Sequence, residues 1–237
     1  IEDDPIKASA LAGLEVGGLI YAGLSLDQEK QAFRDQNLLV QRPNNSLTHA
    51  FDQRSPIVLI AKTLLDRVPQ FQNNVEMVEN GLGKHNSKLI TFSTLVSATQ
   101  HMFPNLPQTE LEALSEWTVA FWVAAANNLP DNPWRVVGRE ERNCQRQESL
   151  AVTAVAIQAL GLIARDLYVE GVPSEDLLKR LSGLKEINWQ REDLLWRERG
   201  VTQMGAKSIA IVQNTRTTID ACHRVLREFT GIIGDSV

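Results

Sequence analysis

The feature that most constrains the fold is an apolar run, LAVTAVAIQALGLIA, at residues 150–164. It stops at Arg165 and contains Thr153 and Gln158. A membrane helix needs about 20 consecutive apolar residues, so this run is too short and too polar to be one. It predicts a buried central helix in a soluble protein. With 237 residues and 43% apolar content, the chain can form one substantial core or two smaller ones that share an interface.

Helical periodicity dominates the rest of the sequence and predicts an α+β fold that is predominantly helical. An apolar run at 16–23 favours a strand, and Ser25 with Gln28 predicts a capping box that opens a helix to about residue 36. Residues 75–78 and 88–95 favour a hairpin or a strand followed by a helix. Further helices are predicted to start near residues 45 and 56 and to span about 109–128, 139–165, 174–181 and 207–229.

The clearest loop is NNLPDNP, at residues 127–133. Its prolines and its Asn and Asp residues favour turns, which makes it a candidate boundary. We expect an α+β part with a small sheet at residues 1–129 and a helical, basic part at residues 130–237.

Several classes of functional site find no support in the sequence. Cys144 and Cys222 stand far apart without metal-ligand spacing, which argues against zinc and disulfides and fits the reducing cytoplasm. The four histidines are scattered, and the common nucleophile, phosphate-loop and metalloprotease motifs are absent. We therefore predict no catalytic residue, cofactor or metal. The first residues, IEDDPIK, do not form a secretory signal, and because they lack an initiator Met we expect a fragment of a longer chain.

Charge is distributed unevenly along the chain. The net charge is −5, yet residues 179–227 contain ten Lys and Arg against five Asp and Glu, which gives a local charge of +5. Such a segment can form a phosphate-contacting face, because electrostatic attraction acts locally. The alternative is a solvated surface with a chance asymmetry.

Two groups of arginines are candidates for that face. Arg139, Arg142 and Arg146 are spaced three and four apart, so one helical face presents three guanidinium groups that can bind phosphates or pair with acids of neighbouring helices. In the second group, Arg197 and Arg199 precede a turn, and Lys207 with Ser208 is predicted at the start of the final helix as an anion site. Trp189 and Trp196 are predicted in the core.

A spaced set of residues between Gly23 and Phe71 carries a family resemblance. It comprises a Phe-x-Asp-x-Asn, then basic and polar residues, then an Asp-x-Arg before an apolar helix: Phe33, Asp35, Asn37, Arg42, Ser46, Asp52 and Arg54. This order resembles the region after the DGQHR motif in DNA sulfur modification proteins of the DndB family. The likeness continues at 86–100, in the helix with Trp117 and Trp122, at 146–161, at 187–200 and at 206–215.

The DGQHR motif itself is absent from the sequence. We expect it upstream of Ile1 or in a gap, and no activity of that segment is carried over to this chain. The motif residues that are present are interpreted as structural: Asn37 can close a helix in the left-handed conformation, and Asp52 with Arg54 can tie a turn to a neighbouring helix.

The resemblance implies a regulator that binds double-stranded DNA at promoters of a DNA phosphorothioation gene cluster. We predict that its DNA contacts lie among Arg139, Arg142, Arg146, Arg197, Arg199, Lys207 and Arg216. Contacts with other DNA sulfur modification proteins and self-association stay open, and no membrane partner is expected. The first alternative is a nucleotide-hydrolysing or nuclease-like enzyme completed by a missing N-terminal segment, and the second is a scaffold for the modification enzymes.

Overall fold

The computed structural model describes residues 45–83, 86–106, 111–135, 138–205 and 210–232, together with residues 23, 25, 26 and 28. Contacts divide the chain into Ile1–Arg42 and Pro43–Val237, and each unit is described by itself. In the first, the predicted capping box is present, because Ser25 N donates to Gln28 Oε1 at 2.9 Å and Gln28 N donates to Ser25 Oγ at 3.4 Å. The rest of its predicted strand and helix lies outside the described residues.

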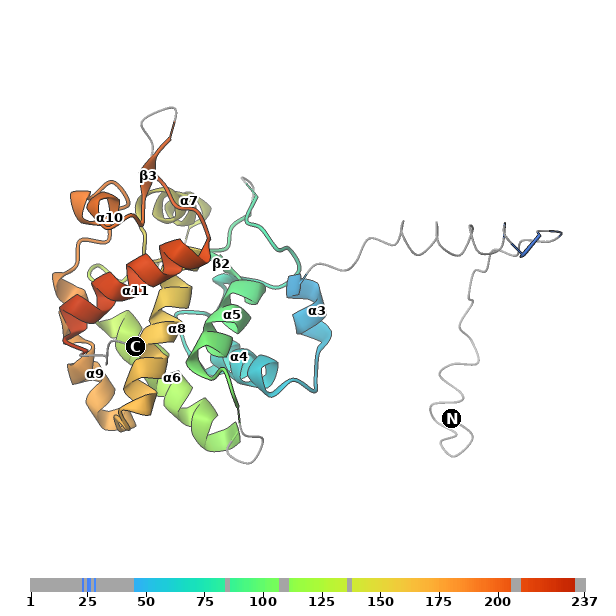
Figure 1. Cartoon of the computed structure of the whole chain (residues 1–237), viewed down its shortest axis with the longest axis horizontal. Helices are drawn as coiled ribbons and strands as arrows, with labels where there is room; N and C mark the ends of the chain where they lie inside the picture. The colour runs from blue at the N-terminus through green and yellow to red at the C-terminus, as the bar shows by residue number, and fades with distance from the viewer. Residues whose placement is uncertain are drawn as a thin grey trace. The chain divides into compact units, whose positions relative to one another are not determined.

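The second unit is built around α8 (Ala154–Val169), which confirms the predicted buried helix (Figure 1). Its residues from Val155 to Ala164 are all buried, so the helix is covered on every side. α5 (Phe92–Met102) packs against one side of α8, and α11 (Arg216–Thr230) packs against another. Gly161 permits the first of these contacts, because a Cβ at this position would overlap the backbone of Ala98 in α5.

The remaining helices of this unit form an outer layer. α4 (Pro56–Arg67) packs against α5 and α6 (Leu111–Asn127), and α3 (Asn45–Phe51) packs against α5. α4 has Ser55 at its N-cap and Pro56 in its first turn, and it ends before Pro69, as the sequence predicts. The smaller elements are η2 (Ser174–Asp176), α9 (Leu177–Arg180), η3 (Ser182–Glu186) and α10 (Leu194–Glu198).

The first sheet pairs β1 (Val75–Glu76) with β2 (Ile90–Thr91) in parallel. Thr91 ends β2 and also caps α5, so the strand passes directly into the helix. Of the two alternatives for this region, the strand followed by a helix is therefore correct. Helices dominate and strands are short in the described part of the chain, which confirms the predicted fold class.

The predicted single helix at 139–165 is wrong, because the chain forms α7 (Arg139–Glu148) and then α8. Between them the backbone turns to pair with the segment before α10: Leu150 N donates to Trp189 O at 2.7 Å, and Arg191 N donates to Glu148 O at 2.7 Å. These backbone bonds between distant segments of the chain replace the helical bonds that residues 149–153 would make in a continuous helix. A new helix then starts at the Thr153 cap.

The predicted start of the final helix at Lys207 is also wrong, because α11 begins at Arg216. The preceding residues form a hairpin of β3 (Gln203–Met204) and β4 (Ala210–Ile211), in which Gln203 pairs with Ile211. Thr215 then caps the helix, since its Oγ1 accepts from Thr218 N at 3.3 Å. Residues 206–209 lie outside the described residues, so the anion site predicted at Lys207 and Ser208 loses the helix terminus on which it depended.

Both tryptophans predicted in the core are buried, at 6% exposure for Trp189 and 0% for Trp196. Their indole N–H groups donate to the backbone oxygens of Leu184 and Asn188 at 3.1 and 2.8 Å. The apolar core also runs continuously past the loop at 127–133, from α4 and α5 to α8 and α11.

Candidate functional site

A cavity of about 650 Å³ lies where the N-terminal ends of α5 and α8 face the C-terminal half of α7. We name it the arginine pocket and define it by six of its lining residues: Thr91, Arg146, Thr153, Gln158, Arg191 and Asn214. The segment before α10 and the segment after β4 complete its wall. No Asp or Glu occurs among the described residues that line it.

Two helix termini open into the arginine pocket. Thr91 caps α5, and its Oγ1 accepts from Thr94 N at 3.3 Å. Thr153 caps α8, and its Oγ1 accepts from Ala156 N at 3.2 Å. Because the N–H groups of a first helical turn carry a partial positive charge, both termini raise the potential in the pocket.

Arg146 and Arg191 add two full positive charges. Arg146 donates through Nη2 to Asn143 Oδ1 at 2.6 Å, while its buried Nε has no acceptor among the described residues. Arg191 donates through Nε to Ser149 O at 3.2 Å. Burial lowers the pKa of both guanidinium groups, yet arginine stays protonated at neutral pH. Within the described ranges, neither pairs with a carboxylate.

Gln158 links the pocket to the start of α11. Its Nε2 donates to Asn214 Oδ1 at 3.0 Å, and its Oε1 lies 3.3 Å from His101 Nε2. Burial lowers the pKa of His101, the hydrogen bond to Gln158 opposes this shift, and the positive charge of Arg216 adds to it.

The three arginines predicted on one face of α7 have different surroundings. Arg146 lines the arginine pocket, whereas Arg142 lines a second cavity and donates through Nε to Asn74 Oδ1 at 2.9 Å. Arg139 is exposed. Their role as DNA contacts stays a prediction.

The other predicted cations lie at the surface. Arg197 is exposed on α10, and Arg199, which follows this helix, pairs with Glu228 of α11 at 2.5 Å. Arg216 pairs with Asp220 one turn further along α11 at 3.0 Å. Lys207 lies outside the described residues.

Of the motif residues behind the family resemblance, Ser46, Asp52 and Arg54 are described, and Phe33, Asp35, Asn37 and Arg42 are not. Asp52 Oδ1 accepts from the backbone N–H groups of Arg54 and Ser55 at 2.8 and 3.1 Å, which lowers the pKa of this carboxyl. Lys62 Nζ donates to Asp52 O at 2.5 Å and ties the turn to α4. The Arg54 side chain itself is exposed.

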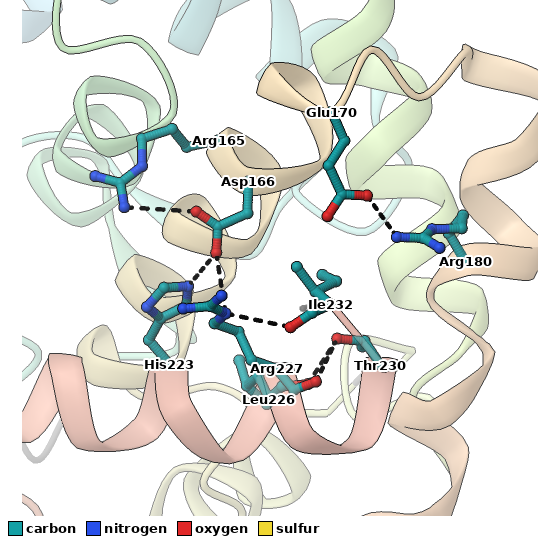
Figure 2. A network of polar contacts seen from close by, with 9 residues as sticks. All are labelled: Arg165, Asp166, Glu170, Arg180, His223, Leu226, Arg227, Thr230 and Ile232. Atoms are coloured by element: carbon teal, nitrogen blue, oxygen red, sulfur yellow. Dashed lines mark hydrogen bonds and ion pairs between the residues drawn. The ribbon is translucent and has the colours of Figure 1, made fainter. Parts of the chain in front are cut away.

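A second polar cluster lies at the other end of α8, where Asp166 meets three basic side chains (Figure 2). Its Oδ2 lies 2.7 Å from His223 Nε2 and 3.6 Å from Arg227 Nε, and its Oδ1 lies 3.5 Å from Arg165 Nη2. Burial opposes ionisation of Asp166, but the hydrogen bond to His223 and the neighbouring charges outweigh it, so the pKa lies below its usual value. This cluster joins α8 to α11.

Among the pocket residues, the sequence predicts Arg146 as a site residue but does not predict Arg191 or Thr153 as site residues. Arg191 lies in the basic segment at residues 179–227 but is not among the predicted contacts, and Thr153 was noted only as a polar residue within the apolar run. A threonine ahead of an apolar helix is an N-cap signal, which could have placed the start of α8. The pairing of residues 148–150 with 189–191, which brings Arg191 to the pocket, has no local sequence signal.

The described ranges lack two further kinds of feature. No helix there has the length and apolar character that crossing a membrane requires. The same residues also bring together no group of three His, Cys, Asp or Glu side chains suited to a metal ion.

Comparison with known protein families identifies a match that covers most of the chain. The family model DndB, described as DNA-sulfur modification-associated, matches residues 1–233. No curated protein and no solved structure matches the chain.

Proposed function

We propose that this chain, which belongs to the DndB family of DNA-sulfur modification-associated proteins, is a cytoplasmic, DNA-binding regulator. Its target is double-stranded DNA in the promoter region of a DNA sulfur modification gene cluster. The family match, which covers almost the whole sequence, supports the link with DNA sulfur modification. The placement of the arginines supports the proposed position of the DNA-contacting surface.

The observation that carries the proposal is the shared location of three elements that bear arginines, namely α7, α10 and the start of α11. α7, α10 and the β3–β4 hairpin are drawn at one end of the unit, and α11 starts near them (Figure 1). The bond from Arg191 N to Glu148 O joins the end of α7 to the segment before α10. Arg139 of α7 and Arg197 of α10 are exposed. A duplex can therefore meet guanidinium groups from separate elements at once.

The ion pairs of Arg199 and Arg216 do not remove these cations from the surface. The two side chains of the Arg199–Glu228 pair are 46% and 49% exposed, and those of Arg216–Asp220 are 66% and 42% exposed. Exposed pairs contribute only about 0–1 kcal/mol, because water and salt screen them. A DNA phosphate can replace the carboxylate at small cost.

The test is a salt titration of binding to a promoter-fragment duplex, followed by fluorescence anisotropy. We compare the wild type with Arg197→Gln/Arg199→Gln and with the control Arg67→Gln/Arg180→Gln, which removes the same charge elsewhere. The plot of log K against log salt should flatten by about 0.9 for each phosphate that the first variant no longer neutralises. Equal slopes for the first variant and the wild type would reject this surface, and a wild type that does not bind would reject DNA binding.

Regulation needs a separate measurement. A reporter gene driven by the same fragment should change its expression when the wild-type chain is supplied, and Arg197→Gln/Arg199→Gln should weaken that response. DNA binding without any effect on the reporter would leave a DNA-binding protein and contradict the regulatory role.

A further inference from the structure

We propose that the arginine pocket binds a small phosphate-bearing ligand of about the size of a mononucleotide. This site shares Arg146 with the predicted DNA contacts but does not include the exposed Arg139 and Arg197. The inference does not rest on the proposed function. It rests on three properties of the cavity: unpaired positive charge, unused helix N–H groups, and a mixed polar and apolar wall of suitable volume.

The charge of the pocket has no counterpart among the described residues. Both nitrogens at the end of the Arg191 side chain lack an acceptor there, and so does the buried Nε of Arg146. The terminal nitrogens of Arg146 have only neutral acceptors, Asn143 Oδ1 at 2.6 Å and Gly83 O at 3.4 Å. Withdrawing a cation from water is costly unless an anion or a set of acceptors replaces the water. No described Asp or Glu lines the cavity to do so. An anionic ligand supplies the missing charge.

The start of α8 supplies donors for the same anion. The first backbone bond of this helix is made by Ile157 N to Thr153 O at 3.1 Å, and Ala156 N uses the Thr153 hydroxyl. The N–H groups of Ala154 and Val155 precede these bonds and have no acceptor among the described residues, although both residues line the pocket. Helix N–H groups together with arginine forks are a common arrangement for binding phosphate.

The rest of the wall suits an organic group attached to the phosphate. Leu82, Val152 and Val212 give the cavity an apolar side, and Asn45 and Asn80 give it amide groups that can both donate and accept. The volume of about 650 Å³ lies within the usual range for small-molecule sites, about 300–1,000 Å³. A heterocyclic ring can pack on the apolar side while its polar edge meets an amide, so the chemistry favours a nucleoside phosphate.

The experiment measures binding to the full chain by isothermal titration calorimetry and by thermal shift. The probes are inorganic phosphate, AMP and ATP, with adenosine as the uncharged control. AMP or ATP should bind more tightly than phosphate, adenosine should bind most weakly, and Tm should rise with ligand concentration. No binding by any phosphate-bearing probe would overturn the inference.

Arg191→Gln and Arg146→Gln test the two guanidinium groups. Each should weaken AMP or ATP binding by about tenfold or more, because each removes charge-assisted hydrogen bonds. Arg224→Gln is the matched control, since Arg224 is exposed on α11 and does not line the pocket. Unchanged affinity in both pocket variants would overturn the assignment of the site.

Ala154→Glu tests the pocket without depending on the arginines. A carboxylate in the first turn of α8 is favourable for the helix, so folding should be retained, but it places a negative charge among the anion donors. Nucleotide binding should then be lost while Tm is maintained. A variant that folds and binds ATP as the wild type does would contradict the inference.

A final comparison separates a free ligand from a DNA phosphate. Short oligonucleotides with and without a 5′-phosphate are tested as competitors of AMP or ATP. Competition only by the 5′-phosphorylated form supports a site for terminal phosphate groups. If the pocket variants abolish DNA binding while no free nucleotide binds, the pocket belongs to the DNA surface and the inference is overturned.

Discussion

The two ends of α8 differ in how positive charge is balanced. At its C-terminal end, Arg165, His223 and Arg227 surround one carboxylate, Asp166 (Figure 2). At its N-terminal end, Arg146 and Arg191 line a cavity without a described carboxylate. Both ends carry partly buried basic groups, so burial alone does not distinguish them.

The difference separates a structural cluster from a candidate binding site. A buried acid among several bases satisfies both charges within the protein and fixes the contact between two helices. Cations that share a cavity without an acid can obtain a negatively charged partner only from a bound ligand. They therefore stabilise the fold little and favour binding of an anion. Removing a charge should therefore affect folding at one end of α8 and binding at the other.

The largest expected effect is that of Asp166→Ala. This change leaves Arg165, His223 and Arg227 near one another without their shared acid, and it breaks the connection between α8 and α11. Removing one partner of a buried ionic cluster costs about 3–5 kcal/mol, and we expect a loss near the lower value because Asp166 retains 17% exposure. Urea denaturation measures the loss.

Cys222 provides an independent check of the same change. This thiol is fully buried on α11, and burial raises its pKa to about 12. It therefore reacts with a thiol reagent only when the helix opens, and Asp166→Ala should accelerate its labelling. A variant with wild-type stability and wild-type labelling of Cys222 would show that the cluster does not hold the two helices together.

Gly161→Ala should have the next largest effect on stability. Gly161 lies on α8 between the two ends compared above. The added Cβ would overlap the backbone of Ala98, so α5 must move. Overpacking of this kind costs about 1–3 kcal/mol. The control is Gly83→Ala, where a Cβ meets no atom within 4 Å and the expected change is within about 0.5 kcal/mol. Similar urea midpoints for both variants would contradict the close approach of α5 and α8.

Low pH should selectively weaken the contribution that the Asp166 cluster, at the C-terminal end of α8, makes to the stability of the fold. The folded-state pKa of Asp166 lies below its usual value of about 3.9, so this group stabilises the fold above that pH. The contribution is lost as the pH falls through the folded pKa. Urea denaturation at pH 7, 5, 4 and 3 should show a smaller loss in Asp166→Asn than in the wild type. Parallel curves for the two proteins would assign the acid sensitivity to other carboxyl groups, such as Glu76.

The elements that sequence alone could predict are those whose signals are local. The apolar run marked α8, Ser55-Pro56 marked the start of α4, and Ser25 with Gln28 marked a capping box. In each case residues within one or two turns determine the conformation. Trp189 and Trp196 were likewise recognisable as core residues because their apolar neighbours are adjacent in sequence.

The errors arose where distant segments compete with helix propensity. Residues 149–153 could continue a helix, yet Leu150 instead bonds to Trp189, which is 39 positions later. Ala210 and Ile211 pair with Met204 and Gln203 as strands, although the predicted helix from about residue 207 included Ala210 and Ile211. Both errors displaced site residues: the first concealed how Arg191 reaches the pocket, and the second put Lys207 at a helix start that lies at Arg216.

The smallest expected effect on stability is that of Arg191→Gln, and it sharpens the comparison most. The change removes a bond from Nε to Ser149 O but leaves no acid without a partner among the described residues. The net change should stay within about 1 kcal/mol, the usual value of one hydrogen bond, and the lower cost of burying an uncharged side chain offsets part of it. Urea denaturation of Arg191→Gln and Asp166→Ala in parallel measures the contrast. A loss in Arg191→Gln as large as that in Asp166→Ala would mean that Arg191 stabilises the fold as Asp166 does, and the distinction between the two ends of α8 would fail.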